Sequence, residues 1–231
     1  MKKTLLLPFI AIFTFVLVSC EESAKNKTEE TQNQELRKIS LLQKIANANG
    51  FQEWENVDKV SFTFNVDRDT THFERSWEWK PKEDKVKMLA SNDTLEYHTN
   101  QVEKDSTLMK ADQAFVNDKY WLLFPFQLIW DDGFKHSTKE NISSPLKSEK
   151  VTELTIDYNS EDGYTPGDLY KVYFDANYMI KEWAYYPGGN KEPRIISTWE
   201  DYETQKGIKF AKMHQDSTGN FKLYFTKVSI R

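Results

Sequence analysis

The chain has 231 residues with a formal net charge of −5, an acidic balance that argues against nucleic acid as a partner because phosphate binding requires a basic face. Its 7 Trp, 11 Tyr and 15 Phe residues are too many for a disordered polymer and predict a packed core. Cys20 is the single cysteine, which excludes an internal disulfide and a cysteine-based zinc site.

The N-terminus has the parts of an export signal. Lys2 and Lys3 are followed by an apolar run from Leu5 to Val18, which is too short for a comfortable membrane span. The sequence Leu17-Val18-Ser19-Cys20 resembles a bacterial lipobox, and this resemblance implies cleavage after residue 19 and lipid attachment to Cys20. We therefore expect residues 1–19 to be a signal peptide and the protein to be held by acyl chains in the cell envelope, at the outer membrane. The alternative is an uncleaved signal anchor.

The next segment is a predicted tether. Residues 21–34 are polar and charged, with no aromatic or branched aliphatic side chain. We expect a disordered, lipid-anchored linker over residues 20–34, followed by one domain over residues 35–231.

The domain is predicted to begin with an amphipathic helix over residues 35–49. Leu36, Ile39, Leu42 and Ile45 recur at spacings of three and four, and Gly50 stands where a helix C-terminal glycine belongs. The apolar stripe of this helix must be buried against another element.

Period-two alternation then predicts a four-stranded antiparallel meander over residues 59–99. If its strands pair in simple register, five aromatic side chains share the face that covers the helix. Under the functional hypothesis they line a cavity for a lipid or another apolar ligand, and under the alternative they form an ordinary packed core. These candidate ligand-binding residues are Phe62, Phe64, Trp77, Trp79 and Tyr97.

Arg75 interrupts this aromatic face and is the sixth candidate ligand-binding residue. Its guanidinium could bind a phosphate or carboxylate head group. The alternatives are that it reaches the sheet edge or pairs with a nearby acid.

A second helix is predicted within residues 111–130, where the run from Tyr120 to Trp130 is almost wholly apolar. The run could be a lid or a membrane-dipping patch, but we favour a buried helix that stops near Pro125.

The second half predicts five or six more strands, several of them apolar on both faces. The fold class is therefore mostly β (α+β), a strongly curved antiparallel sheet or half-barrel of about ten strands wrapped around one or two helices. The expected strands cover residues 154–158, 170–174, 180–186, 195–199, 208–214 and 221–230.

Three short motifs carry a family resemblance. Tyr120-Trp121-Leu122-Leu123, Gly163-Tyr164-Thr165-Pro166-Gly167-Asp168 and Thr198-Trp199-Glu200-Asp201-Tyr202 resemble those of uncharacterised Bacteroidota envelope lipoproteins. The helix, the Gly50-Phe51-x-x-Trp54 turn and the meander resemble the lipoprotein-carrier (LolA-like) half-barrel superfamily. The resemblance implies an apolar cavity between sheet and helices that holds acyl chains.

The sequence contains no recognised catalytic motif, so we expect a protein that is not an enzyme and uses no cofactor. The acidic stretch from Asp157 to Asp168 only partly matches a calcium loop, and we expect no metal site there. We expect a lipoprotein that binds a hydrophobic or amphiphilic ligand. The alternatives are an assembly lipoprotein with a packed core that binds an envelope protein, and a carboxylate-based hydrolase.

Overall fold

The computed structural model describes residues 39–89, 94–159 and 166–231. The chain divides into two compact units, residues 1–40 and 41–231, and only Ile39 and Ser40 of the first unit are described. The expected signal peptide, the tether and Cys20 lie outside the described residues, as do residues 160–165 of the acidic stretch. All of the described helices and strands belong to the larger unit.

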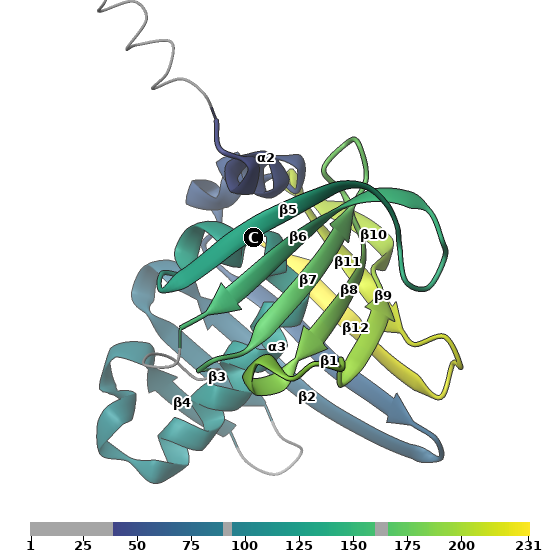
Figure 1. The fold of residues 1–231 in the computed structure, drawn as a ribbon. Coiled ribbons are helices and arrows are strands. Elements are labelled where there is room, and N and C mark those ends of the chain that lie inside the picture. The colour runs from purple at the N-terminus through teal and green to yellow at the C-terminus, as the bar shows by residue number, and fades with distance from the viewer. Residues whose placement is uncertain (1–38, 90–93, 160–165) are drawn as a thin grey trace, which may run out of the picture. The chain divides into compact units, whose positions relative to one another are not determined.

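This larger unit consists of two antiparallel sheets and a long central helix (Figure 1). The seven-stranded sheet has the order β10-β11-β12-β1-β2-β3-β4. Its strands are β1 (Val60–Arg68), β2 (Thr71–Lys80), β3 (Lys85–Leu89), β4 (Thr94–His98), β10 (Glu200–Gln205), β11 (Ile208–Gln215) and β12 (Phe221–Ile230).

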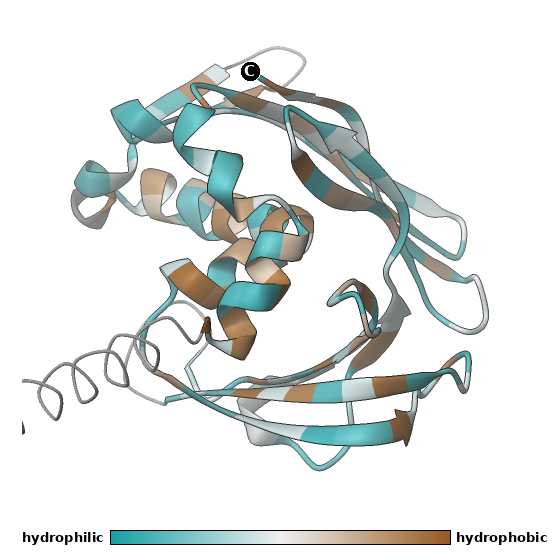
Figure 2. Cartoon of the chain, turned by 90° about the horizontal axis from the view of Figure 1, so that it is seen from above, coloured by the Kyte–Doolittle hydropathy of each residue, from teal (hydrophilic) through white to brown (hydrophobic). Residues whose placement is uncertain are grey.

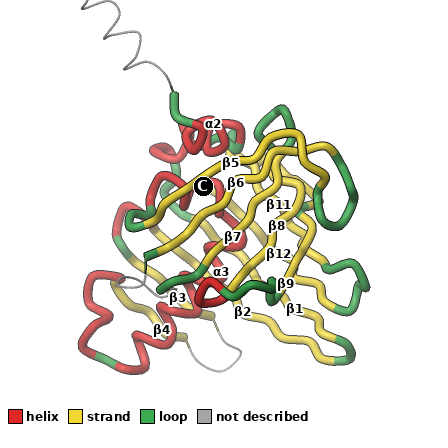
Figure 3. The backbone as a smooth tube through the Cα atoms, viewed as in Figure 1, coloured by secondary structure: helices red, strands yellow, loops and turns green. Residues whose placement is uncertain are grey.

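The five-stranded sheet has the order β5-β6-β7-β8-β9, so each strand pairs with its neighbour in sequence. Its strands are β5 (Phe134–Ser143), β6 (Lys150–Tyr158), β7 (Leu169–Phe174), β8 (Ile180–Tyr186) and β9 (Ile195–Thr198). The described helices are α2 (Leu41–Ala48), α3 (Ser106–Trp130) and four short 3₁₀ segments, η1 (Phe51–Asn56), η2 (Pro81–Glu83), η3 (Thr99–Lys104) and η4 (Pro187–Gly189), all distinguished from the strands by colour in Figure 3.

The chain returns from the five-stranded to the seven-stranded sheet through a single residue. Trp199 separates β9 from β10, and the side-chain oxygen of Thr198 accepts a hydrogen bond of 3.2 Å from the backbone N–H of Gln215 on β11. The chain therefore continues almost directly from β9 into β10. The two sheets curve around the helices without closing (Figure 2). This confirms the predicted fold class.

The strand count exceeds the predicted ten because two polar strands were missed. β5 is exposed along almost all of its length, and β10 consists of acidic and polar side chains apart from Tyr202, which packs against the core. Both lie at sheet edges, where a strand is specified by backbone pairing rather than by burial.

The helix α3 begins and bends for identifiable reasons. The Asp105 carboxylate caps its first turn by accepting hydrogen bonds from the backbone N–H groups of Thr107 (2.7 Å) and Leu108 (3.2 Å). The backbone leaves helical geometry at Leu123 (φ −121°, ψ 28°), two residues before Pro125, and the helix then continues to Trp130. The prediction that the helix stops near Pro125 is thus confirmed in part: helical geometry is interrupted there, but it resumes beyond the bend and continues to Trp130.

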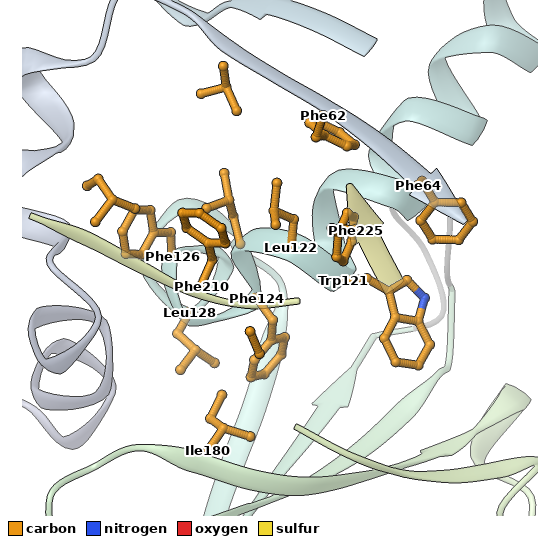
Figure 4. Packing of buried hydrophobic residues seen from close by; sticks show 14 of the residues in the cluster. Phe62, Phe64, Trp121, Leu122, Phe124, Phe126, Leu128, Ile180, Phe210 and Phe225 are labelled. Carbon is orange, nitrogen blue, oxygen red and sulfur yellow. The ribbon is translucent and has the colours of Figure 1, made fainter. Parts of the chain in front are cut away.

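Residues 121–128 of α3 are all buried, so this apolar run is core rather than lid. Figure 4 shows its side chains lying between Phe62 and Phe64 of β1 and Ile180 of β8, so that this part of α3 packs between the two sheets. Within the part of the chain that the structure describes, no helix combines the length and the apolar character needed to span a bilayer.

Candidate functional site

The predicted aromatic face exists as a packed layer. Phe62 pairs with Trp77, and Trp79 lies next to Val86, the cross-strand partner of Tyr97, so all of these side chains share one face of the seven-stranded sheet. The ring of Phe115 on α3 lies 5.4 Å from that of Trp77 and 5.6 Å from that of Trp79. Phe62, Phe64, Trp77 and Tyr97 are buried and Trp79 is half-buried. Their role as ligand contacts stays a prediction.

Arg75 is engaged by an acid of the same protein. Its Nε and Nη2 atoms donate hydrogen bonds of 2.9 and 2.7 Å to the two carboxylate oxygens of Asp118 on α3. The indole N–H of Trp77 donates a further bond of 2.8 Å to Asp118. Arg75 therefore has the acidic partner that the sequence left open as an alternative, and a head-group role for it stays a prediction.

A cavity of about 690 Å³ lies between α3 and the concave face of the five-stranded sheet. None of the six predicted ligand-binding residues lines it. The helix contributes Gln113, Val116, Asn117, Tyr120, Trp121, Gln127 and Trp130. The sheet and the adjoining loops contribute Asp131, Asp132, Gly133, Tyr158, Asn159, Tyr170, Trp183 and Tyr185.

Strand register explains the aromatic wall of this cavity. Tyr170 pairs with Tyr185 across β7 and β8, and Val172 pairs with Trp183, which places these rings on one face. The Tyr170 ring stacks on Tyr185 at 5.1 Å and lies 5.2 Å from Trp183. Tyr120 of α3 closes the group, with its ring 5.4 Å from Tyr170. The wall is a continuous set of rigid aromatic surfaces.

The polar edge of the cavity is a hydrogen-bonded chain that ends on a carboxylate. The hydroxyl of Tyr158 donates to Oδ2 of Asp131 at 2.7 Å, and the hydroxyl of Tyr120 lies 3.3 Å from that of Tyr158. Burial raises the pKa of the Asp131 carboxyl, and the charge of Asp132 raises it further, while the Tyr158 hydrogen bond and Lys119 act in the opposite direction. Burial also raises the pKa of both tyrosines.

Tyr185 is held in place by a second carboxylate. Its hydroxyl donates to Oδ2 of Asp168 at 2.7 Å, and the backbone N–H of Gly188 donates to Oδ1 at 2.8 Å. Asp168 belongs to the acidic stretch that partly matches a calcium loop. Among the described residues no three or more His, Cys, Asp or Glu side chains are arranged to hold a metal ion.

Two buried polar atoms of the cavity lining have no hydrogen-bond partner among the described residues. They are the side-chain oxygen of Gln127 and the indole N–H of Trp183. Buried polar groups are nearly always paired in folded proteins, and an unpaired one costs about 1–3 kcal/mol.

Sequence reasoning placed the site on the first meander and missed this cavity. The wall of the cavity comes from strands of the second half. Their aromatic residues, such as Tyr170 and Trp183, were interpreted only as a sign that both faces of these strands are buried. The available signal was the density of aromatic residues at one parity of β6, β7 and β8 opposite the run of α3. The sequence could not predict the bend of α3, and this bend determines where a cavity remains between the helix and the five-stranded sheet.

Comparison with known proteins gives only distant likenesses. No family model matches the chain, and no curated protein matches it in sequence. The structure is similar to a crystal structure of a DUF1329 family protein from Desulfovibrio piger, with a TM-score of 0.42, 8% identity, and coverage of 80% of this chain and 91% of that chain. It is also similar to a LolA superfamily protein from Nitrosomonas europaea, with a TM-score of 0.40, 10% identity, and coverage of 79% and 94%. Values this low say nothing about a ligand.

Proposed function

We propose that this protein binds the apolar part of an amphiphilic molecule and does not transform it. The observation that carries the proposal is the cavity of about 690 Å³ between α3 and the five-stranded sheet. Its volume falls within the range of about 300–1,000 Å³ that small-molecule pockets occupy, and such pockets are mostly apolar with a few polar groups. The seven aromatic rings of its lining fit that description.

An alkyl chain would gain free energy from burial against these rings. Each CH₂ group removed from water contributes about 0.8 kcal/mol. Tyrosine and tryptophan rings offer large contact areas and lose little conformational entropy on binding. Affinity should therefore rise with chain length until the chain fills the cavity.

The N-terminal sequence supports a location for this protein in the cell envelope. We propose that the protein is an envelope lipoprotein anchored through an acylated Cys20, because the positive start, the apolar run and the lipobox-like residues occur in the expected order. Mass analysis of the mature protein from a bacterial membrane fraction tests this proposal. A Cys20→Ser variant should be recovered uncleaved and without acyl chains.

Isothermal titration of the purified chain with decyl and dodecyl maltoside, each below its micelle concentration, tests the binding proposal. We expect one site, and the two additional CH₂ groups should tighten binding by about 1.6 kcal/mol, roughly 15-fold, when both are buried. Absence of saturable binding for both detergents would contradict the proposal.

A cavity-filling variant with a matched control locates the site. Val116→Trp places a large side chain in the cavity and should abolish binding, because Val116 lines it from α3. Met109→Trp adds the same side chain at an exposed position on the same helix and should leave affinity unchanged. Unfolding curves of both variants show that the fold is retained.

A carboxylate-based hydrolase is the second candidate, and the raised pKa of Asp131 in a cavity favours it. A panel of chromogenic glycosides and esters tests this alternative. Turnover that is lost in Asp131→Asn would establish hydrolysis, whereas no turnover across the panel would leave binding as the function.

A further inference from the structure

We propose that the cavity selects amphiphiles whose head group is an ammonium ion, an inference that rests on the proposed binding function. Its described lining contains two carboxylates, Asp131 and Asp132, and no lysine, arginine or histidine. The remaining lining is dominated by tyrosine and tryptophan rings. Aromatic faces combined with carboxylates are the chemistry that recognises quaternary ammonium groups.

The charges around the cavity sum to a negative value. Lys119 is the cation that acts on Asp131, and its own environment includes Asp112 as well. Lys119 thus acts on two carboxylates, those of Asp131 and Asp112, and Asp132 adds a third negative charge beside Asp131. Asp131 also follows the last residue of α3, where the carbonyl end of the helix carries a partial negative charge. An anionic head group would be repelled by the carboxylates and by the carbonyl end of the helix, whereas a cationic head group would be attracted by them.

The rings next to the cavity already hold one ammonium group. The Nζ atom of Lys119 lies 5.5 Å from the ring centre of Trp130, which lines the cavity, and 5.4 Å from that of Trp79. These distances are within the range of about 6 Å for a favourable cation–π contact. On the cavity side, Tyr120 and Tyr158 are linked to Asp131 and offer equivalent rings beside a carboxylate.

Unused acceptor atoms favour the same class of head group. Oδ2 of Asp131 is occupied by Tyr158, whereas Oδ1 accepts no hydrogen bond from the residues that the structure describes. The buried side-chain oxygen of Gln127 also lacks a partner within those residues. That oxygen and the unpaired indole N–H of Trp183 are fully buried, so the acceptor on which the inference depends is Oδ1 of Asp131.

The test is titration of the purified chain with three twelve-carbon probes, each below its micelle concentration. The probes are dodecyltrimethylammonium, dodecyl maltoside and dodecanoate, which differ in head-group charge. We expect the ammonium probe to bind at least about tenfold more tightly than the maltoside, and dodecanoate to bind most weakly. Asp131→Asn, which keeps the shape of the side chain and can still accept from Tyr158, should remove most of this preference.

The control separates a site effect from attraction to an acidic protein. Asp157 is exposed, lies next to Tyr158 in sequence and is not part of the lining, so Asp157→Asn makes the same charge change outside the cavity and should leave the preference intact. Asp132→Asn serves as a second cavity variant should Asp131→Asn fail to fold. Equal affinities for the ammonium and maltoside probes, or a preference that survives neutralisation of the cavity carboxylates, would overturn the ammonium inference while leaving the binding function standing. No binding of any probe would overturn both.

Discussion

Arg75 of β2 and Asp118 of α3 form a two-pronged ion pair that joins the seven-stranded sheet to the central helix. Both carboxylate oxygens of Asp118 accept from the guanidinium, and Oδ2 also accepts from the indole N–H of Trp77. The Asp118 side chain is fully buried, while that of Arg75 is 27% exposed. The pair fixes how α3 lies against the sheet, and it explains why an arginine interrupts an aromatic face.

Removing the acid should be costly. Asp118→Ala leaves the Arg75 charge and the Trp77 indole N–H without their acceptor, so we expect the free energy of unfolding to fall by about 3 kcal/mol. Urea denaturation measures the change. Glu78 lies on the same strand as Arg75, and Glu78→Ala, which breaks a half-buried ion pair with Lys59, should cost about 1 kcal/mol or less. Similar losses in both variants would show that the buried pair has no special role.

Gly50 should tolerate no side chain. Its φ of +86° lies in the left-handed region, and a Cβ atom there would come 2.0 Å from the backbone oxygen of Gly207. Gly50→Ala is therefore expected to destabilise the fold by more than about 2 kcal/mol, because backbone atoms must move. Gly219→Ala is the matched control, since Gly219 has a φ of +73° but no atom within 4 Å of the added Cβ. That variant should lose only about 1 kcal/mol, the conformational penalty alone.

The periodicity of apolar residues predicted the strands and the end of the first helix, but it did not predict features that depend on tertiary contacts. Alternation placed β1 to β4 and the face shared by Phe62 and Trp77, because a strand buried on one side has a period of two. The glycine at position 50 ended α2 as expected. The cavity was missed because it depends on the bend at Leu123 and on the distance between two sheets, which no local pattern encodes. The same limit applies to Asp118, since nothing in its sequence neighbourhood indicates its partner Arg75, 43 positions away.

His214 should make stability depend on pH. It is fully buried among Trp121, Trp199 and Phe225, and burial lowers its pKa to about 3, while its hydrogen bond with the backbone oxygen of Thr198 acts in the opposite direction. The unfolded chain protonates this histidine near pH 6.5 and the folded chain does not, so the unfolded state binds more protons between these values. His214 thus contributes its full stability above about pH 6.5 and loses about 1.4 kcal/mol per pH unit as the pH falls towards 3.

Comparison of His214→Phe with the parent chain isolates the contribution of His214 to the pH dependence of the unfolding free energy. Between about pH 6 and pH 4 the unfolding free energy of the parent should fall by roughly 2–3 kcal/mol more than that of the variant, which has no titrating group at this position. His136→Phe changes an exposed histidine and should leave the parent profile unchanged. Parallel profiles for the parent and His214→Phe would contradict a neutral, buried His214.

Affinity for the ammonium probe should fall as the pH is lowered. The cation is attracted by the ionised form of Asp131, and burial raises the pKa of that carboxyl, so affinity should begin to fall at a higher pH than for an ordinary aspartate. Asp132 acts in the same direction as burial, and Lys119 and the Tyr158 hydrogen bond act against it. Dodecyl maltoside, which carries no charge, should bind equally well across the range.

Tyr158→Phe should shift the pH dependence of ammonium binding in a defined direction. The variant keeps the ring but removes the hydroxyl that donates to Oδ2 of Asp131 at 2.7 Å, so the ionised carboxylate loses a stabilising bond and its pKa rises further. The midpoint of the affinity-against-pH curve for dodecyltrimethylammonium should therefore move to higher pH, and Asp131→Asn should flatten the curve. Tyr186→Phe removes a hydroxyl from the same sheet outside the cavity and should leave the midpoint unchanged. A midpoint that stays fixed or moves to lower pH in Tyr158→Phe would show that Asp131 is not the carboxylate that holds the cation.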